Sequence, residues 1–241
     1  MAEHVEYVAK HFSLTHIVYG ADDPLGIPLA LLSLSPIFLF VAYFALVVFG
    51  RRLSLLLLAG GSVFNEAFSL ALKRLLREPR PFPDRPHVGD GYGMPSSHAQ
   101  AGAFLFAWGV GYALSLDKRY PAAAVSDGIK MVRRVRTGVY LFGLLAWSLC
   151  VAYSRFALHY HSVPQIVAGY AAGIIAGASW YTATEYIPRV YPTSIPGRIR
   201  SGIECVWVGV GGIGGWQVGG ADGGWGEGPL FVNSAATKKN Q

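Results

Sequence analysis

Three short segments of the chain hold side chains that could act chemically on an anion. The first runs from Lys73 through Arg80 to Pro81, and the third contains Arg155. Arginine binds phosphate through two parallel hydrogen bonds and lysine supplies a compact charge, so these cations suit a phosphorylated ligand. Prolines on both sides of Arg80 stop a helix and favour extended chain there. A basic flank of a membrane span has the same composition and is the alternative for the first segment.

The second segment, residues 95–98, reads Pro-Ser-Ser-His and directly precedes an apolar run. Ser96 and Ser97 are residue types that cap the start of a helix. A helix N-terminus offers free N–H groups and the positive end of the helix dipole to an anion, and His98 would stand beside it. An ordinary helix cap with a histidine that takes no part in chemistry is the alternative.

The third segment, residues 154–165, adds two imidazoles to the cation of Arg155. The two imidazoles are those of His159 and His161, and we interpret His159 as an interfacial side chain. Gln165 ends the segment, and no Asp or Glu lies within it to complete a metal site with the two histidines. We therefore expect neither a metal nor a cofactor.

The elements that must position these segments are apolar and long. Hydrophobic residues make up 52% of the 241-residue chain, only 14% are charged, and the mean hydropathy is +0.36. Soluble domains carry roughly 25% charged residues, so the composition excludes an ordinary soluble enzyme, and it excludes a largely disordered chain. Five runs are long enough to cross a membrane, with a single charge, Glu66, inside the second. They are residues 27–50, 53–72, 99–116, 137–154 and 162–184.

These runs predict an all-α, polytopic membrane helix bundle with about five transmembrane helices. With five spans, 13 of the 20 Lys and Arg residues fall on one side, which the positive-inside rule makes cytosolic. All seven histidines and the three polar segments fall on the other, lumenal or extracellular side. We predict a lumenal N-terminal segment at 1–26, a transmembrane core at 27–184 and a cytosolic tail at 185–241. The net charge of +6 is spread between apolar runs, so nucleic acid is not an expected partner.

Together the three segments resemble the type-2 phosphatidic acid phosphatase superfamily, whose signature is K-x6-R-P, P-S-G-H and S-R-x5-H-x3-D. The first motif is complete from Lys73 to Pro81, whereas Ser97 replaces the glycine of the second and Gln165 replaces the aspartate of the third. The resemblance implies that Lys73, Arg80 and Arg155 bind the phosphoryl oxygens, with Ser96 and the Ser97 backbone completing the cradle. It also implies that His161 attacks phosphorus and that His98 protonates the leaving group.

A closer resemblance covers roughly residues 10–190 and points to the dolichyl-diphosphatases of the endoplasmic reticulum. It rests on Leu14-Thr15-His16, residues 32–36, the pair Asn65-Glu66, residues 92–94 and the Gln165 ending. It implies hydrolysis of a polyisoprenoid diphosphate lipid, dolichyl diphosphate, at the lumenal face of the endoplasmic reticulum membrane. That reaction recycles the lipid carrier for protein N-glycosylation. The alternatives are a phosphatase for phosphatidate, a sphingoid phosphate or another isoprenoid phosphate, and a non-catalytic lipid-binding membrane protein.

Two features of the chain leave questions for the structure. Gln165 can accept a hydrogen bond from His161 but brings no charge, so another carboxylate has to compensate or catalysis is slower. Glu66 is the candidate from the sequence, because an ionisable side chain inside a span usually faces a polar interior; tying two helices together with Asn65 is the alternative. The tail holds 12 glycines between Gly202 and Gly228, so we expect it to be flexible.

Overall fold

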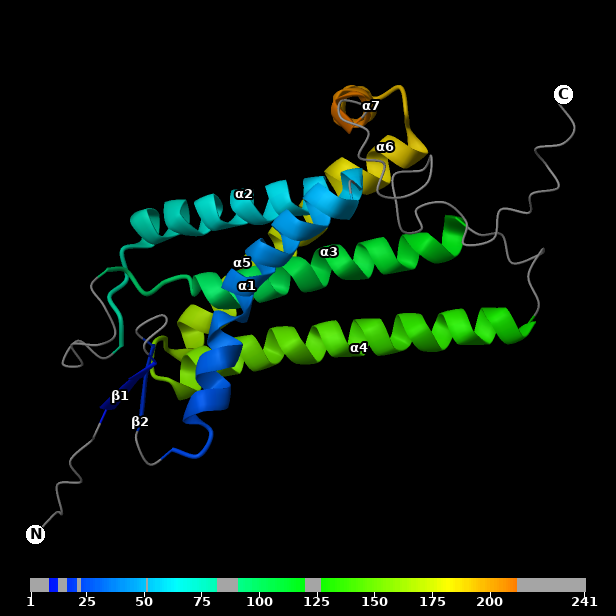
Figure 1. The fold of residues 1–241 in the computed structure, drawn as a ribbon. Helices are drawn as coiled ribbons and strands as arrows, with labels where there is room; N and C mark the ends of the chain where they lie inside the picture. The colour runs from blue at the N-terminus through cyan, green and yellow to red at the C-terminus, as the bar shows by residue number, and fades with distance from the viewer. Residues whose placement is uncertain are drawn as a thin grey trace, which may run out of the picture.

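In the computed structural model the described residues are 9–12, 17–20, 23–50, 52–81, 91–119 and 127–211. Helices dominate this part of the chain, and a small hairpin precedes them (Figure 1). The bundle helices are α1 (Gly26–Gly50), α2 (Leu53–Leu76), α3 (Ser97–Arg119), α4 (Asp127–Ala157) and α5 (Val163–Tyr181). Each of the five expected spans is a helix, which confirms the predicted all-α membrane bundle.

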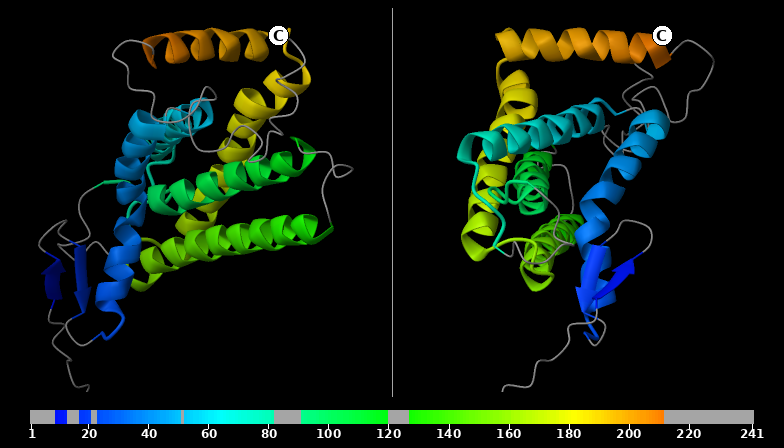
Figure 2. Two further views of the ribbon diagram at one scale, coloured as in Figure 1. Left: turned by 45° about the vertical axis from the view of Figure 1, so that its right-hand side comes forward. Right: turned by 90° about the vertical axis from the view of Figure 1, so that its left-hand side faces the viewer.

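Four of the five helical segments are long and apolar enough to cross a membrane. They are Gly26–Phe49, Leu53–Leu76, Asp127–Ala157 and Val163–Val190. Among the described residues, helix α3, the expected third span, does not belong to these four. It lies inside the bundle, packed against α2, α4 and α5 (Figures 1 and 2), so much of its surface faces protein instead of lipid. The chain is a multi-pass membrane protein.

Helices α3 and α5 approach each other closely through glycines spaced four residues apart. A Cβ atom added at Gly173 would lie 2.3 Å from the Gln100 carbonyl oxygen, and one at Gly169 would lie 2.5 Å from that of Ser96. Only glycine permits such backbone proximity, which is the usual role of small residues between membrane helices. The same packing fixes Ser96 and the start of α3, which carries Ser97 and His98, against the N-terminal half of α5.

The N-terminal residues form a two-stranded antiparallel hairpin that the sequence analysis did not anticipate. Strand β1 (Ala9–Phe12) pairs with β2 (Ile17–Gly20). The Val18 N–H donates to the Tyr160 hydroxyl at 3.1 Å, and Ile17 is buried in a cluster with Leu34 and Leu158. The hairpin therefore packs on the end of the bundle that carries the polar segments.

At the opposite end of the bundle, helical structure continues past the boundary predicted at residue 185. A π-helical turn (Thr182–Tyr186) leads into α6 (Ile187–Val190), and α7 (Ile195–Gly211) crosses this end of the bundle (Figure 2). Residues 212–241, most of the predicted flexible tail, lie outside the described residues, as do residues 1–8 of the predicted N-terminal segment. The proposed division into segments stays a prediction.

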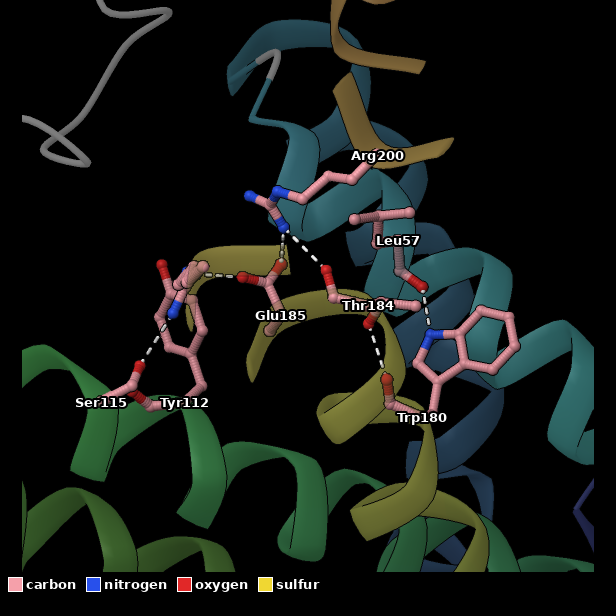
Figure 3. Close-up of polar contacts among 8 residues, drawn as sticks. Leu57, Tyr112, Ser115, Trp180, Thr184, Glu185 and Arg200 are labelled. Atoms are coloured by element: carbon pink, nitrogen blue, oxygen red, sulfur yellow. Dashed lines mark hydrogen bonds and ion pairs between the residues drawn. The ribbon is translucent and has the colours of Figure 1, made fainter. Parts of the chain in front are cut away.

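Buried Glu185 joins these last helices to the bundle (Figure 3). It forms ion pairs with Arg189, one turn further on, and with Arg200 of α7 at 2.9 Å. Arg189 also donates to the Ser115 hydroxyl of α3 at 3.0 Å, and Arg200 donates to the Thr184 carbonyl at 2.9 Å. Both guanidinium groups are thus fixed by a carboxylate and by further oxygen acceptors.

Candidate active site

The three polar segments meet at one end of the bundle. Lys73 lies in the last turn of α2, which ends at Leu76 and is capped by Arg77 in the left-handed conformation (φ 51°). The chain then runs extended through Pro79, which pairs with Tyr92, while the Gly93 N–H donates to the Glu78 carbonyl at 2.7 Å. Because residues 78–79 and 92–93 are paired through their backbones, the segment after α2 is held beside the segment before α3.

The start of α3 contributes the second segment. Helix α3 begins at Ser97, and the buried Ser96 precedes it, with its N–H donating to the Gln165 carbonyl at 3.1 Å. The Ser96 hydroxyl is buried and has no hydrogen-bond partner within the described chain. Lys73 Nζ donates to the Ser97 hydroxyl at 3.5 Å, which brings the first two segments into contact. His98 lies within electrostatic reach of Lys73 and of His161.

Arg155, near the end of α4, is 5% exposed and is positioned by two side chains. Its guanidinium group stacks over the Tyr160 ring, 4.0 Å from the centroid, and donates to the Ser33 hydroxyl of α1. Its Nε is buried and has no partner among the described residues. Ser33 and Tyr160 are site residues that the sequence analysis did not assign. Ser33 stands in a stretch that carried the closer resemblance, and Tyr160 stands between the two histidines of the third segment.

A tight turn after α4 brings His161 back toward Arg155. The N–H groups of Tyr160 and His161 both donate to the Arg155 carbonyl, at 3.0 and 3.2 Å. His159 adopts the left-handed conformation (φ 61°) at the centre of this turn and is half-buried, whereas His161 is only 2% exposed. The backbone thus directs one of the two imidazoles into the site and keeps the other partly exposed.

Gln165 fixes the orientation of the His161 ring. The Gln165 Nε2 group donates to Glu78 Oε1 at 3.0 Å and to the Pro79 carbonyl at 2.9 Å, while Oε1 accepts from the Ser162 N–H at 3.3 Å. Because the carbonyl can only accept and the backbone N–H can only donate, the amide has one orientation. Its Oε1, 3.3 Å from His161 Nδ1, therefore accepts from Nδ1–H. The lone pair of the neutral ring is then on Nε2.

The carboxylate that contacts Gln165 is Glu78, a residue that the sequence analysis missed. Its signal was a lone carboxylate immediately before the Pro-Arg-Pro of the first motif. The charge of Glu66 bears on Lys73, two turns further along α2. No described contact joins Glu66 to His161 or Gln165, so its supporting role stays a prediction. Asn65, its neighbour, ties α2 to α3 by accepting from Gln100 Nε2 at 3.0 Å.

Positive charge dominates the site. Desolvation and the nearby cations Arg155, Arg80 and Lys73 lower the pKa of His161 from 6.5 to about 3, so its imidazole is neutral at physiological pH. Within the described part of the chain, none of the three cations forms a salt bridge. The predicted residues Lys73, Arg80, Ser96, Ser97, His98, Arg155, His161 and Gln165 thus gather around one cation-rich site that can bind an anion beside a neutral imidazole.

Residues 52–189 match the PAP2 superfamily, and this stretch is more than half of the chain. The chain belongs to the PAP2 superfamily. Among named relatives of this PAP2 chain, Dolichyldiphosphatase 1 of Homo sapiens is 36% identical over 73% of this chain and 71% of its own. Dolichyldiphosphatase 1 of Dictyostelium discoideum is 34% identical over 77% of this chain and 76% of its own length. Dolichyldiphosphatase of Saccharomyces cerevisiae is 28% identical over 70% of this chain and 68% of its own length. No solved structure matches the chain.

Proposed function

We propose that this PAP2 protein hydrolyses dolichyl diphosphate to dolichyl phosphate and inorganic phosphate. The observation that carries the proposal is the group of three cations around neutral His161, without salt bridges among the described residues. The names of the relatives supply the substrate, and the membrane helices supply a place for its isoprenoid tail. A diphosphate at the lipid headgroup brings the negative charge that the site lacks.

In the first step, Nε2 of His161 attacks the terminal phosphorus. The N–P bond forms as the bond between phosphorus and the bridging oxygen breaks, and that oxygen leaves as dolichyl phosphate, with a proton supplied by His98, whose protonated form is favoured by the negative charge of the bound diphosphate. Arg155, Arg80 and Lys73 bind the phosphoryl oxygens and stabilise the charge that develops on them. The Ser96 hydroxyl and the N–H groups at the start of α3 complete the phosphate cradle.

In the second step, water attacks the phosphohistidine. His98, now neutral, takes a proton from that water, the N–P bond breaks and inorganic phosphate leaves. The burial of His161, together with the cations, keeps its ring unprotonated before each turnover. The ring is therefore available as a nucleophile even in mildly acidic conditions.

The proposal includes the location of the reaction. The catalytic segments lie at the C-terminal ends of α2 and α4 and the N-terminal ends of α3 and α5. The distribution of Lys and Arg assigns those ends to the non-cytosolic side, which is the lumen in an endoplasmic reticulum membrane. An engineered glycosylation acceptor at residues 85–90 checks this side, because a folded protein that stays unmodified there contradicts a lumenal site.

The direct test measures phosphate release from dolichyl diphosphate by the full chain in detergent, with EDTA present. We expect turnover by the wild type and its loss in His161→Ala, whereas the matched variant His159→Ala, on the exposed side of the turn, retains more activity than His161→Ala. Phosphatidate, a sphingoid phosphate and another isoprenoid phosphate are the comparison substrates. Preference for any of them contradicts the substrate assignment. A folded wild type that releases phosphate from none of them contradicts the enzymatic proposal and favours a lipid-binding role.

A further inference from the structure

Glu78 is the one described carboxylate in contact with the amide that orients His161. Gln165 is 1% exposed, and its Nε2 group lies 3.0 Å from Glu78 Oε1 while its Oε1 lies 3.3 Å from His161 Nδ1. The side chains thus form a linear series, carboxylate to amide to imidazole. A hydrogen bond to a charged acceptor polarises the donor group, and a polarised amide is a stronger acceptor at its oxygen.

The surrounding backbone is built to keep this series together. The Glu78 carbonyl accepts from the Gly93 N–H, which pins the residue against the segment before α3. A Cβ atom at Gly93 would lie 2.6 Å from Gln165 Nε2, so a side chain at this position would displace the amide. The Pro79 carbonyl provides the second acceptor for Nε2, which leaves the amide no alternative orientation.

We propose that Glu78 is a positioning residue that acts on His161 through Gln165. It holds the ring in the Nδ1–H tautomer, with Nε2 free, and it supplies the negative charge that an aspartate at position 165 would bring directly. The proposal rests on the proposed function, in which His161 is the nucleophile.

The need for this charge arises during the reaction. When Nε2 bonds to phosphorus, the ring still carries the proton on Nδ1 and becomes positively charged. Three cations already surround it, and each opposes that new charge. The substrate phosphates offset part of the repulsion, and a carboxylate connected through polarised hydrogen bonds offsets more. The negative charge of Glu78 therefore stabilises the phosphohistidine and the transition states on either side of it.

The test compares four full-length variants in the phosphate-release assay: Glu78→Gln, Gln165→Asp, the double variant Glu78→Gln/Gln165→Asp, and the exposed-carboxylate control Glu204→Gln on α7. Glu78→Gln keeps the size and an acceptor oxygen but removes the charge. We expect kcat to fall about 10- to 100-fold with little change in KM, the range found for outer partners of metal-binding histidines. The double variant should recover at least half of the lost kcat on a logarithmic scale, because it places a carboxylate directly beside Nδ1. The Glu204→Gln control should stay within about 2-fold.

Two results would overturn the proposal. The first is an unchanged kcat in Glu78→Gln. The second is a loss of kcat in Glu78→Gln that the folded double variant does not restore. The second result would mean that Glu78 only holds the backbone. A wild type inactive on every lipid phosphate would contradict the proposed function instead. In that case, NMR of the ¹⁵N-histidine-labelled protein still decides the positioning role: the Nδ1–H proton resonance of His161 should move upfield in Glu78→Ala, because the hydrogen bond to the amide is no longer polarised by a carboxylate. An identical Nδ1–H resonance in both proteins would contradict the inference.

Discussion

Both ends of the helical bundle hold arginines against buried polar side chains, but the positive charge is treated in opposite ways. At the end that leads into α7, Glu185 pairs with Arg189 and Arg200, so the charge is neutralised within the protein (Figure 3). At the other end, Arg155 stacks on Tyr160 and donates to Ser33, and no described carboxylate pairs with it. By the rise of α3, the two ends are roughly 30 Å apart.

The difference separates a structural charge cluster from a functional one. A buried cation without a counter-charge is costly, and proteins retain such groups mainly where a ligand or a reaction uses them. The Glu185 cluster needs no ligand, since each guanidinium has an ion pair and a further hydrogen bond within the chain. The Arg155 cluster is complete only when an anion brings the missing charge.

Removing the buried carboxylate should have the largest effect on stability. Glu185→Ala leaves Arg189 and Arg200 without their counter-charge and should cost about 3 kcal/mol of stability, the lower end for breaking a buried ion pair, because both arginines keep some exposure to solvent. The thermal midpoint in detergent should fall well below that of the wild type, while kcat per folded molecule changes little. Glu204→Ala, which removes an exposed carboxylate of α7, serves as the control. Equal midpoints for the two variants would contradict the structural role of the Glu185 cluster.

Truncating the buried cation at the other end should reduce activity without reducing stability. Arg155→Ala should lower kcat by about 10²- to 10³-fold, the cost of losing one group that stabilises transition-state charge. Its thermal midpoint should not fall, because a buried, unpaired charge is removed. Arg155→Lys keeps the charge but loses the planar guanidinium group, so its kcat should lie between those of the wild type and Arg155→Ala. A variant that is destabilised but fully active would reverse the comparison.

The close approach of α3 and α5 connects the two ends, and a smaller change tests it. Gly173→Ala places a Cβ against the Gln100 backbone and should cost about 1–3 kcal/mol of stability, the usual range for overpacking. Gly143→Ala on α4 is the matched control, because nothing lies within 4 Å of its added Cβ. A lower thermal midpoint for Gly173→Ala alone is the expected result, and equal midpoints would argue against close packing at this position.

The smallest effect is on the pH dependence of stability. The folded-state pKa of His161 is about 3 against 6.5 in the unfolded chain, so the unfolded state binds more protons between these values. Stability should therefore fall as the pH drops below 6.5, by about 1–2 kcal/mol between pH 6.5 and 5 for this group. His161→Asn should flatten that part of the thermal-midpoint profile. Profiles with the same slope for both proteins would mean that His161 is not buried as a neutral ring.

The sequence was sufficient to predict helices α1 to α5, and it named residues that the structure brings together at one end of the bundle; their catalytic roles stay a prediction. Apolar runs located α1 to α5, because in lipid a span must be both long and apolar, and three spaced motifs located Lys73, Arg80, Arg155 and His161. The prediction missed features that depend on contacts between distant segments. Glu78 and Gln165 are 87 residues apart, so their hydrogen bond follows from packing and not from any local pattern.

The same reason explains the other differences. The hairpin is held by a contact between Val18 and Tyr160, 142 residues apart, and its strands are too short to have a strong pattern of their own. Glu185 ended the last apolar run as a charge and therefore gave the predicted boundary of the core. In the structure this charge pairs with Arg200 and joins α7 to that end of the bundle.

The measurement closest to the central claim is the identification of the phosphorylated residue. The wild type and His98→Ala would be mixed with dolichyl diphosphate labelled in its terminal phosphate, quenched within one turnover and digested for mass spectrometry. Phosphate is expected on Nε2 of His161 in the wild type and in His98→Ala. Phosphate on His98 or His159, or turnover with no labelled histidine, would contradict the central claim.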